Sequence, residues 1–138
     1  MSQENVEIVR QVYEAFTRRD FDAALAIGHD SITWGTLFSV ETAVLRGKQE
    51  IRAAWESQVE ALDVRIDLLE LAPLDETRVL AVGTWSGRGL DSGVPVEQSA
   101  AQVFTVEGGQ VRSVETFASK HEAHKALGLS EQDAHADS

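Results

Sequence analysis

Apolar residues in the first part of the chain recur at spacings of three and four, which is typical of helices with one buried face. This spacing predicts a helix over about residues 3–18, with its stripe formed by Val6, Val9, Tyr13 and Phe16. Asp20 is placed to cap a short second helix over residues 21–27, which Gly28 would end. A third helix is predicted over residues 47–62, with its stripe formed by Ile51, Trp55, Val59 and Leu62.

Later in the chain the apolar period changes from that of a helix to the alternation of strands. An early strand is expected over residues 31–38, followed by an irregular stretch that leads to Arg46. Further strands are expected from Val64 to Leu71, and over residues 78–88, 94–106 and 111–118. A shift of phase at Leu69 predicts a bulge in the first of these strands.

Turn and capping residues divide the later strands and start a last helix. Residues 73–76 form one predicted turn, and the Gly108–Gly109 pair predicts a tight hairpin. Ser119 and Glu122 match a capping box at the start of a short helix that Gly128 would end. This order of elements predicts an α+β fold, a curved antiparallel sheet packed on three N-terminal helices. We expect one domain over residues 1–129 and a flexible polar tail over 130–138.

Composition and charge exclude several classes of function. The 138 residues carry a net charge of −11 and no cysteine, which excludes disulfides and thiolate metal sites. A nucleic-acid binder concentrates positive charge, so we expect no nucleic-acid partner. No apolar run is long enough for a membrane span, and the polar N-terminus lacks the pattern of a signal peptide. We therefore expect a cytoplasmic protein with no membrane partner, no bound metal and no cofactor.

Several segments resemble the SnoaL-like members of the nuclear transport factor 2-like superfamily, which includes polyketide cyclases and relatives of ketosteroid isomerase. They are "SQENVEIVRQVYEAFTRRDFDAALAI", "HDSITW", "RGKQEIRAAW" and "QVFTVEGGQVRSVETFASKHEAHKALGL". The resemblance implies a cone-shaped fold and a homodimer formed through the outer face of the sheet. It leaves the activity open, because this superfamily contains isomerases, cyclases, dehydratases, epoxide hydrolases and non-catalytic proteins.

The residues that ketosteroid isomerases use are not matched in this chain. The position of their helical tyrosine falls on Val12, one residue before Tyr13, and the position of their base falls on Gly35. The position of their protonated acid falls on Gln102, which can donate a hydrogen bond but does not titrate. Isomerisation by that mechanism is therefore not expected.

The resemblance and the strand alternation together predict an apolar pocket inside the cone with a few neutral polar groups. The predicted lining residues are Tyr13, Thr33, Trp55, Val79, Trp85, Gln98, Gln102, Phe104, Val114 and Thr116. Trp55 and Trp85 have a second interpretation as residues of the core or of a dimer interface. A shift of register by one residue would instead turn Glu97 and Glu115 inward.

Three functions remain open at this point, each with a small hydrophobic ligand or a subunit as the partner. An isomerase, cyclase or dehydratase would use Gln102 to polarise a carbonyl and Glu115 or Glu97 as a base. A non-catalytic binding protein would have a ligand-sized cavity without a titratable group. A dimeric assembly or accessory module would have a cone filled by its own side chains.

Overall fold

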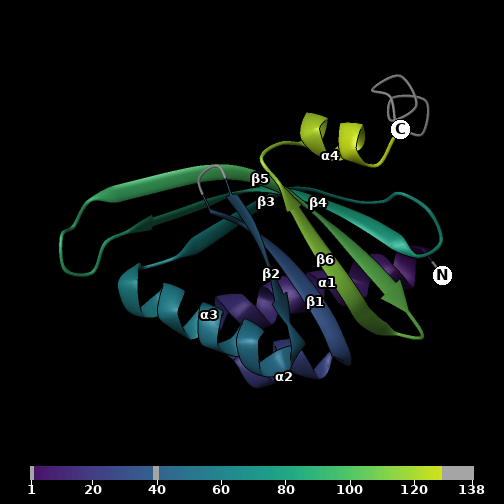
Figure 1. Ribbon diagram of the computed structural model, residues 1–138, viewed down its shortest axis with the longest axis horizontal. Coiled ribbons are helices and arrows are strands. Elements are labelled where there is room, and N and C mark those ends of the chain that lie inside the picture. The colour runs from purple at the N-terminus through teal and green to yellow at the C-terminus, as the bar shows by residue number, and fades with distance from the viewer. Residues whose placement is uncertain (1, 39–40, 129–138) are drawn as a thin grey trace.

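The computed structural model describes residues 2–38 and 41–128, and its four helices are those that the sequence predicts (Figure 1). They are α1 (Ser2–Thr17), α2 (Phe21–Ala26), α3 (Gly47–Ala61) and α4 (Lys120–Ala126). The Asp20 side chain accepts a hydrogen bond from the Ala23 amide, and the Ser119 side chain accepts one from the Glu122 amide. Both predicted N-caps are therefore confirmed. Within the described ranges, no helix is both long and apolar enough to span a membrane.

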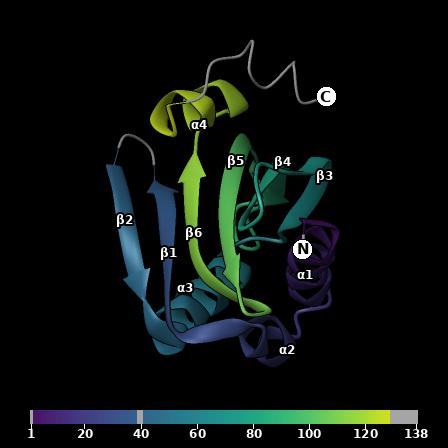
Figure 2. The same cartoon turned by 90° about the vertical axis from the view of Figure 1, so that its right-hand side faces the viewer.

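Six strands form one curved sheet in the order β2-β1-β6-β5-β4-β3 (Figure 2). They are β1 (Gly28–Phe38), β2 (Glu41–Arg46), β3 (Arg65–Pro73), β4 (Arg78–Arg88), β5 (Pro95–Glu107) and β6 (Gln110–Phe117). The predicted α+β class is confirmed. Four neighbouring pairs are antiparallel, whereas β1 and β6 are parallel. The sheet is therefore mixed and not antiparallel throughout as expected, because β1 and β6 run in the same direction.

The expectation of an irregular stretch before Arg46 is wrong, because the strand β2 occupies this segment. It is an edge strand that pairs with β1 alone, and Leu45 lies opposite Trp34. Leu45 packs against the core, whereas its neighbour Val44 is 52% exposed. The segment reads Ala-Val-Leu without alternation, so its sequence gave no period-two signal.

The expected glycine stop after α2 is also wrong. The helix ends at Ala26, and the capping residue Ile27 keeps a helical conformation with φ −78°. Gly28 already belongs to β1 and lies opposite Val111 of β6. The chain passes directly from helix to strand, so no residue in the left-handed region is needed.

The bulge and the tight turn of the sheet lie where the sequence predicts them. The register of β3 against β4 shifts between Leu68 and Glu70, which confirms the predicted bulge. Leu69, the residue between them, is 71% exposed. Gly108 and Gly109 both have positive φ, as a tight turn between β5 and β6 requires.

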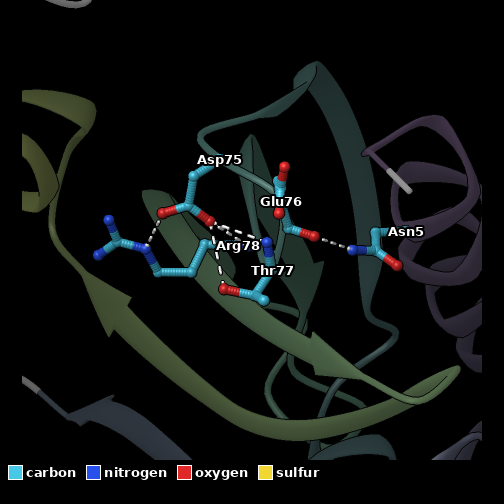
Figure 3. Close-up of polar contacts among 5 residues, drawn as sticks. All are labelled: Asn5, Asp75, Glu76, Thr77 and Arg78. Atoms are coloured by element: carbon cyan, nitrogen blue, oxygen red, sulfur yellow. Dashed lines mark hydrogen bonds and ion pairs between the residues drawn. The ribbon is translucent and has the colours of Figure 1, made fainter.

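The turn between β3 and β4 is held by the carboxylate of Asp75 (Figure 3). It accepts hydrogen bonds from the backbone amides of Thr77 at 2.9 Å and Arg78 at 2.8 Å, and from Arg78 Nε at 2.7 Å. Partial burial acts to raise the pKa of Asp75, but these hydrogen bonds outweigh it and lower that pKa below its usual value. Asn5 Nδ2 donates to the Glu76 carbonyl at 2.8 Å, which connects α1 to this turn.

The helices cover the two faces of the sheet unequally. The helices α1, α2 and α3 pack on what we call the inner face, and α4 lies on the opposite, outer face (Figure 1). Ala123 of α4 packs in a small cluster with Leu80, Ala101 and Val103. Lys120 Nζ also lies 2.9 Å from Glu70 Oε1 of β3. The outer face is therefore covered at one end, and the main core lies on the inner face.

Candidate functional site

The deepest part of the inner face is a row of apolar side chains that runs across the sheet in register. Val79 lies opposite Phe104, Phe104 opposite Val114, and Val114 opposite Trp34. All four side chains are buried. The ring centroids of Trp34 and Trp55 are 5.2 Å apart, and those of Trp34 and Phe104 are 5.7 Å apart. Aromatic rings from α3 and the sheet therefore pack directly against one another in the cone.

The next row of the inner face carries a chain of buried hydrogen bonds. Tyr13 Oη donates to Gln102 Oε1, and Gln102 Nε2 donates to Thr116 Oγ1 at 3.0 Å. Thr116 Oγ1 in turn donates to the Gly35 carbonyl at 2.7 Å. The network joins α1 to three strands, and each polar group in it has a partner.

Tyr13 of this network lies one residue after the position that the family resemblance assigns to a catalytic tyrosine. The position expected for a catalytic tyrosine falls on Val12, yet Tyr13 is the residue whose hydroxyl reaches Gln102. Burial raises the pKa of Tyr13 well above its usual value of 10.0. The phenol is therefore neutral at physiological pH and donates a hydrogen bond, as the amide of Gln102 also does.

The two candidate bases lie on the other face of the sheet. Glu115 is opposite Val103, which packs against α4 on the outer face. Glu97 shares the phase of Val103 on β5, and both glutamates are exposed to solvent. The register that turns them inward is therefore wrong, and so is a mechanism that uses either one as the base inside the cone. Gln102, the third catalytic candidate, does face inward.

The remaining predicted lining residues lie in two places. Trp85 and Gln98 lie opposite each other on the inner face, but Trp85 is half-buried and Gln98 is exposed. The centroid of the Trp85 ring is 6.3 Å from that of Tyr13. The prediction that Thr33 lines the pocket is wrong. Thr33 lies opposite Ser113 and is the residue before Trp34, which faces inward. Strand alternation therefore places Thr33 on the outer face.

A groove of about 380 Å³ lies between α1 and the edge strand β3. Its lining residues are Arg10, Tyr13, Glu14, Thr17, Arg18, Ile66 and Leu68. Tyr13, Ile66 and Leu68 form an apolar floor, and the other four residues are exposed and polar, three of them on α1 and Arg18 directly after it. Ile66 and Leu68 were not among the predicted lining residues. Their alternation with Arg65 and Asp67 was the signal that indicated an inward-facing position.

A second groove of about 670 Å³ lies at the far ends of β4 and β5. Four of its eight lining residues are charged, namely Asp63, Arg65, Arg88 and Glu97. It has no aromatic floor, so it is a weaker candidate for an apolar ligand. In the part of the chain that the structure describes, no group of three His, Cys, Asp or Glu residues is placed to bind a metal.

The chain belongs to the SnoaL-like domain family, whose pattern matches residues 9–114. Similar solved structures include two proteins from Burkholderia that are called NTF2-like. The B. pseudomallei protein, of unknown function, is 22% identical, covers 91% of this chain and 97% of its own, and has a TM-score of 0.75. The B. xenovorans protein is 27% identical with the same two coverages and a TM-score of 0.69.

A third similar structure is a Mycobacterium tuberculosis protein crystallised with estradiol-17β-hemisuccinate. It is 13% identical, covers 88% of this chain and 98% of its own, and has a TM-score of 0.74. No curated protein matches the chain significantly. At these identities the structural likeness establishes the fold, so the function has to be argued from the residues of the site.

Proposed function

We propose that this protein binds a small, mostly apolar molecule in the groove between α1 and β3 and that it does not carry out acid–base catalysis there. The observation that carries the proposal is the groove itself, with its floor of Tyr13, Ile66 and Leu68. Its volume of about 380 Å³ lies within the range of about 300–1,000 Å³ that is usual for small-molecule sites. An apolar floor beside a polar rim suits a ligand with one apolar body and one polar end.

The chemistry of the neighbouring groups favours binding over catalysis. Tyr13, Gln102 and Thr116 hold one another in a satisfied network, and burial keeps the phenol neutral. A general base has to lie within hydrogen-bond reach of the proton that it abstracts. Glu97 and Glu115 are on the outer face, and Glu14 stands on the solvent-exposed rim of the groove. Among the lining residues of the groove, Glu14 is the one carboxylate, and it lies at the exposed rim and not on the apolar floor.

Structures of similar fold support a small-molecule ligand in general terms. The ligand of the Mycobacterium tuberculosis protein, estradiol-17β-hemisuccinate, has a large apolar body. Another protein of similar fold was co-crystallised with polyporic acid. By analogy, we propose a ligand of mixed apolar and polar character for this chain.

The test is binding of the neutral probe 2-naphthalenemethanol, measured by calorimetry, after native mass spectrometry has shown whether the purified protein retains a ligand. We expect saturable binding of one probe per chain. Leu68→Phe fills the groove and should weaken binding at least about tenfold, a loss of about 1.4 kcal/mol. Leu69→Phe is the matched control, because Leu69 is the next residue and is exposed to solvent. Equal affinities for the two variants would contradict the proposal.

We also propose that the protein forms a homodimer, through a surface other than the outer face that the family resemblance implies. The ends of β4 and β5 and the loop between them project at one end of the sheet (Figure 1). This projecting end carries Leu90, Val94 and Val96, which are 59%, 56% and 45% exposed. Exposed apolar side chains gathered in one place favour an interface. We expect native mass spectrometry to show a dimer and Val96→Lys to shift it towards monomer; a monomeric wild-type protein would contradict the proposal.

A further inference from the structure

We propose that the ligand of the groove between α1 and β3 is a small apolar carboxylic acid, with its carboxylate bound by Arg18. This inference rests on the proposed function of the groove and specifies the chemical class of its ligand. The apolar body of the acid would lie on Ile66, Leu68 and the ring of Tyr13. Its charged end would lie at the rim, beside the guanidinium groups of Arg10 and Arg18.

The charge of the rim is unusual for this protein. The chain has 12 Lys and Arg against 23 Asp and Glu, yet the groove is lined by two arginines and one glutamate. Its lining therefore carries a formal charge of +1 in a chain of −11. Charges elsewhere on the surface are screened over about 8 Å at physiological ionic strength. The sign of the rim therefore decides which charged ligand is favoured at close range.

The two arginines are not equivalent. Arg10 Nε lies 3.4 Å from Glu7 Oε2, so its charge is partly compensated. Arg18 forms no ion pair within residues 2–38 and 41–128. A guanidinium presents several N–H donors in a planar arrangement that matches the two oxygens of a carboxylate. Arg18 is therefore the better partner for an acid.

The backbone after α1 holds the groove in place beside Arg18. Arg19 has a positive φ of 62°, a conformation that non-glycine residues seldom adopt. Its guanidinium donates to the Phe16 carbonyl at 3.1 Å and to the Val64 carbonyl at 2.7 Å. Val64 directly precedes β3, so these bonds connect the end of α1 to the start of the strand. The backbone at the neighbouring Arg18 is thereby held close to the start of β3, and the Arg18 side chain is exposed at the rim of the groove.

Glu14 provides an internal check on the role of charge. It lines the same rim one helical turn before Arg18 and would repel a carboxylate. Removing the positive charge of Arg18 and removing the negative charge of Glu14 should therefore change the affinity for an acid in opposite directions. The affinity for a neutral ligand of the same shape should change less in both cases, because that ligand carries no charge.

The experiment compares three probes with the same aromatic body, namely 2-naphthoate, 2-naphthalenemethanol and 2-naphthylmethylammonium. We expect the wild-type protein to bind the carboxylate most tightly. Arg18→Gln should weaken binding of the carboxylate about fivefold, because Arg18 is exposed, and Glu14→Gln should strengthen it about threefold. Binding of the alcohol should change less than binding of the carboxylate in both variants, because the alcohol carries no charge. Arg112→Gln, an exposed change on β6, is the control for net charge.

The outcomes separate this inference from the proposed function. If the alcohol binds and the carboxylate binds no better, or if the ammonium binds most tightly, the inference about an acid is wrong and the groove remains a binding site. If none of the three probes binds, the proposed function itself is wrong. An equal loss of carboxylate affinity in Arg18→Gln and Arg112→Gln would show a general charge effect and would also overturn the inference.

Discussion

The closed part of the cone and the groove beside β3 are built from similar apolar residues but are packed differently. In the closed part, Trp34, Trp55 and Phe104 pack ring against ring and are buried. In the groove, Ile66 and Leu68 are only half-buried and face a space of about 380 Å³. Under the proposed function, apolar residues of the inner face would serve stability in the closed part and ligand binding in the groove.

Tyr13 belongs to both regions and marks the boundary between them. Its ring lines the groove, while its hydroxyl donates a hydrogen bond to Gln102 in the interior. The polar groups of the interior are therefore already satisfied without a ligand. Under the proposed function, a ligand would therefore gain more from the open apolar floor than from displacing the internal network.

The largest expected effect tests whether the closed part is a structural core. Phe104 is 0% exposed, so Phe104→Ala should lower the free energy of unfolding by about 3–5 kcal/mol. Leu69→Ala, at an exposed position, should change it by less than about 0.5 kcal/mol. Urea unfolding followed by tryptophan fluorescence measures both. A cost below about 1 kcal/mol for Phe104→Ala would contradict the view that this region is tightly packed.

The second-largest effect is expected from the buried hydrogen-bond network, which should contribute to the free energy of unfolding and not to ligand affinity. Gln102→Leu leaves the Tyr13 hydroxyl without its acceptor and should cost about 1–3 kcal/mol. The same variant should bind 2-naphthalenemethanol within about twofold of wild type. A stable Gln102→Leu protein that no longer binds the probe would place the ligand in the cone and reverse the comparison.

The raised pKa of Tyr13 predicts a loss of stability at alkaline pH. Above the usual tyrosine pKa of 10.0, the unfolded chain releases a proton that the folded chain retains. The free energy of unfolding should therefore fall by up to about 1.4 kcal/mol per pH unit, until the pH reaches the folded pKa. Tyr13 is the only tyrosine, so tyrosinate absorbance reports on it directly. Tyr13→Phe should remove this dependence, and ionisation of the folded chain near pH 10 would contradict the assignment.

The smallest effect contrasts the buried network with a polar network at the surface. Asp75→Ala removes the carboxylate that holds the β3–β4 turn and should cost about 1 kcal/mol near neutral pH. The folded pKa of Asp75 is lowered, so its stabilisation is complete above the usual value of 3.8 and is lost as the pH falls through the folded pKa. Thermal unfolding of both proteins across acidic pH measures this. A cost that stays constant down to the lowest pH would contradict the role of the charge.

Much of the fold could be predicted because its signals are local. The stripe of α1, the caps Asp20 and Ser119, and the bulge at Leu69 each depend on neighbouring residues and were found where the sequence placed them. The strand β2 was missed because an edge strand with a short apolar run lacks alternation.

The candidate site was harder to predict because it depends on contacts between distant segments. The alternation along β5 correctly turned Gln102 inward, but its bond to Tyr13 joins residues 89 positions apart in the chain. The groove depends on the distance between α1 and an edge strand, which no local pattern records. The exclusion of Glu97 and Glu115 depends on strand register, since a shift of one residue would have reversed it.

The most direct test of the central claim is a titration of the methyl-labelled protein with 2-naphthalenemethanol, followed by NMR. If the ligand occupies the groove, the methyl signals of Ile66 and Leu68 should shift in a saturable way, while those of Val79 and Val114 stay in place. Shifts at Val79 and Val114, with Ile66 and Leu68 unchanged, would place the ligand inside the cone and contradict the account.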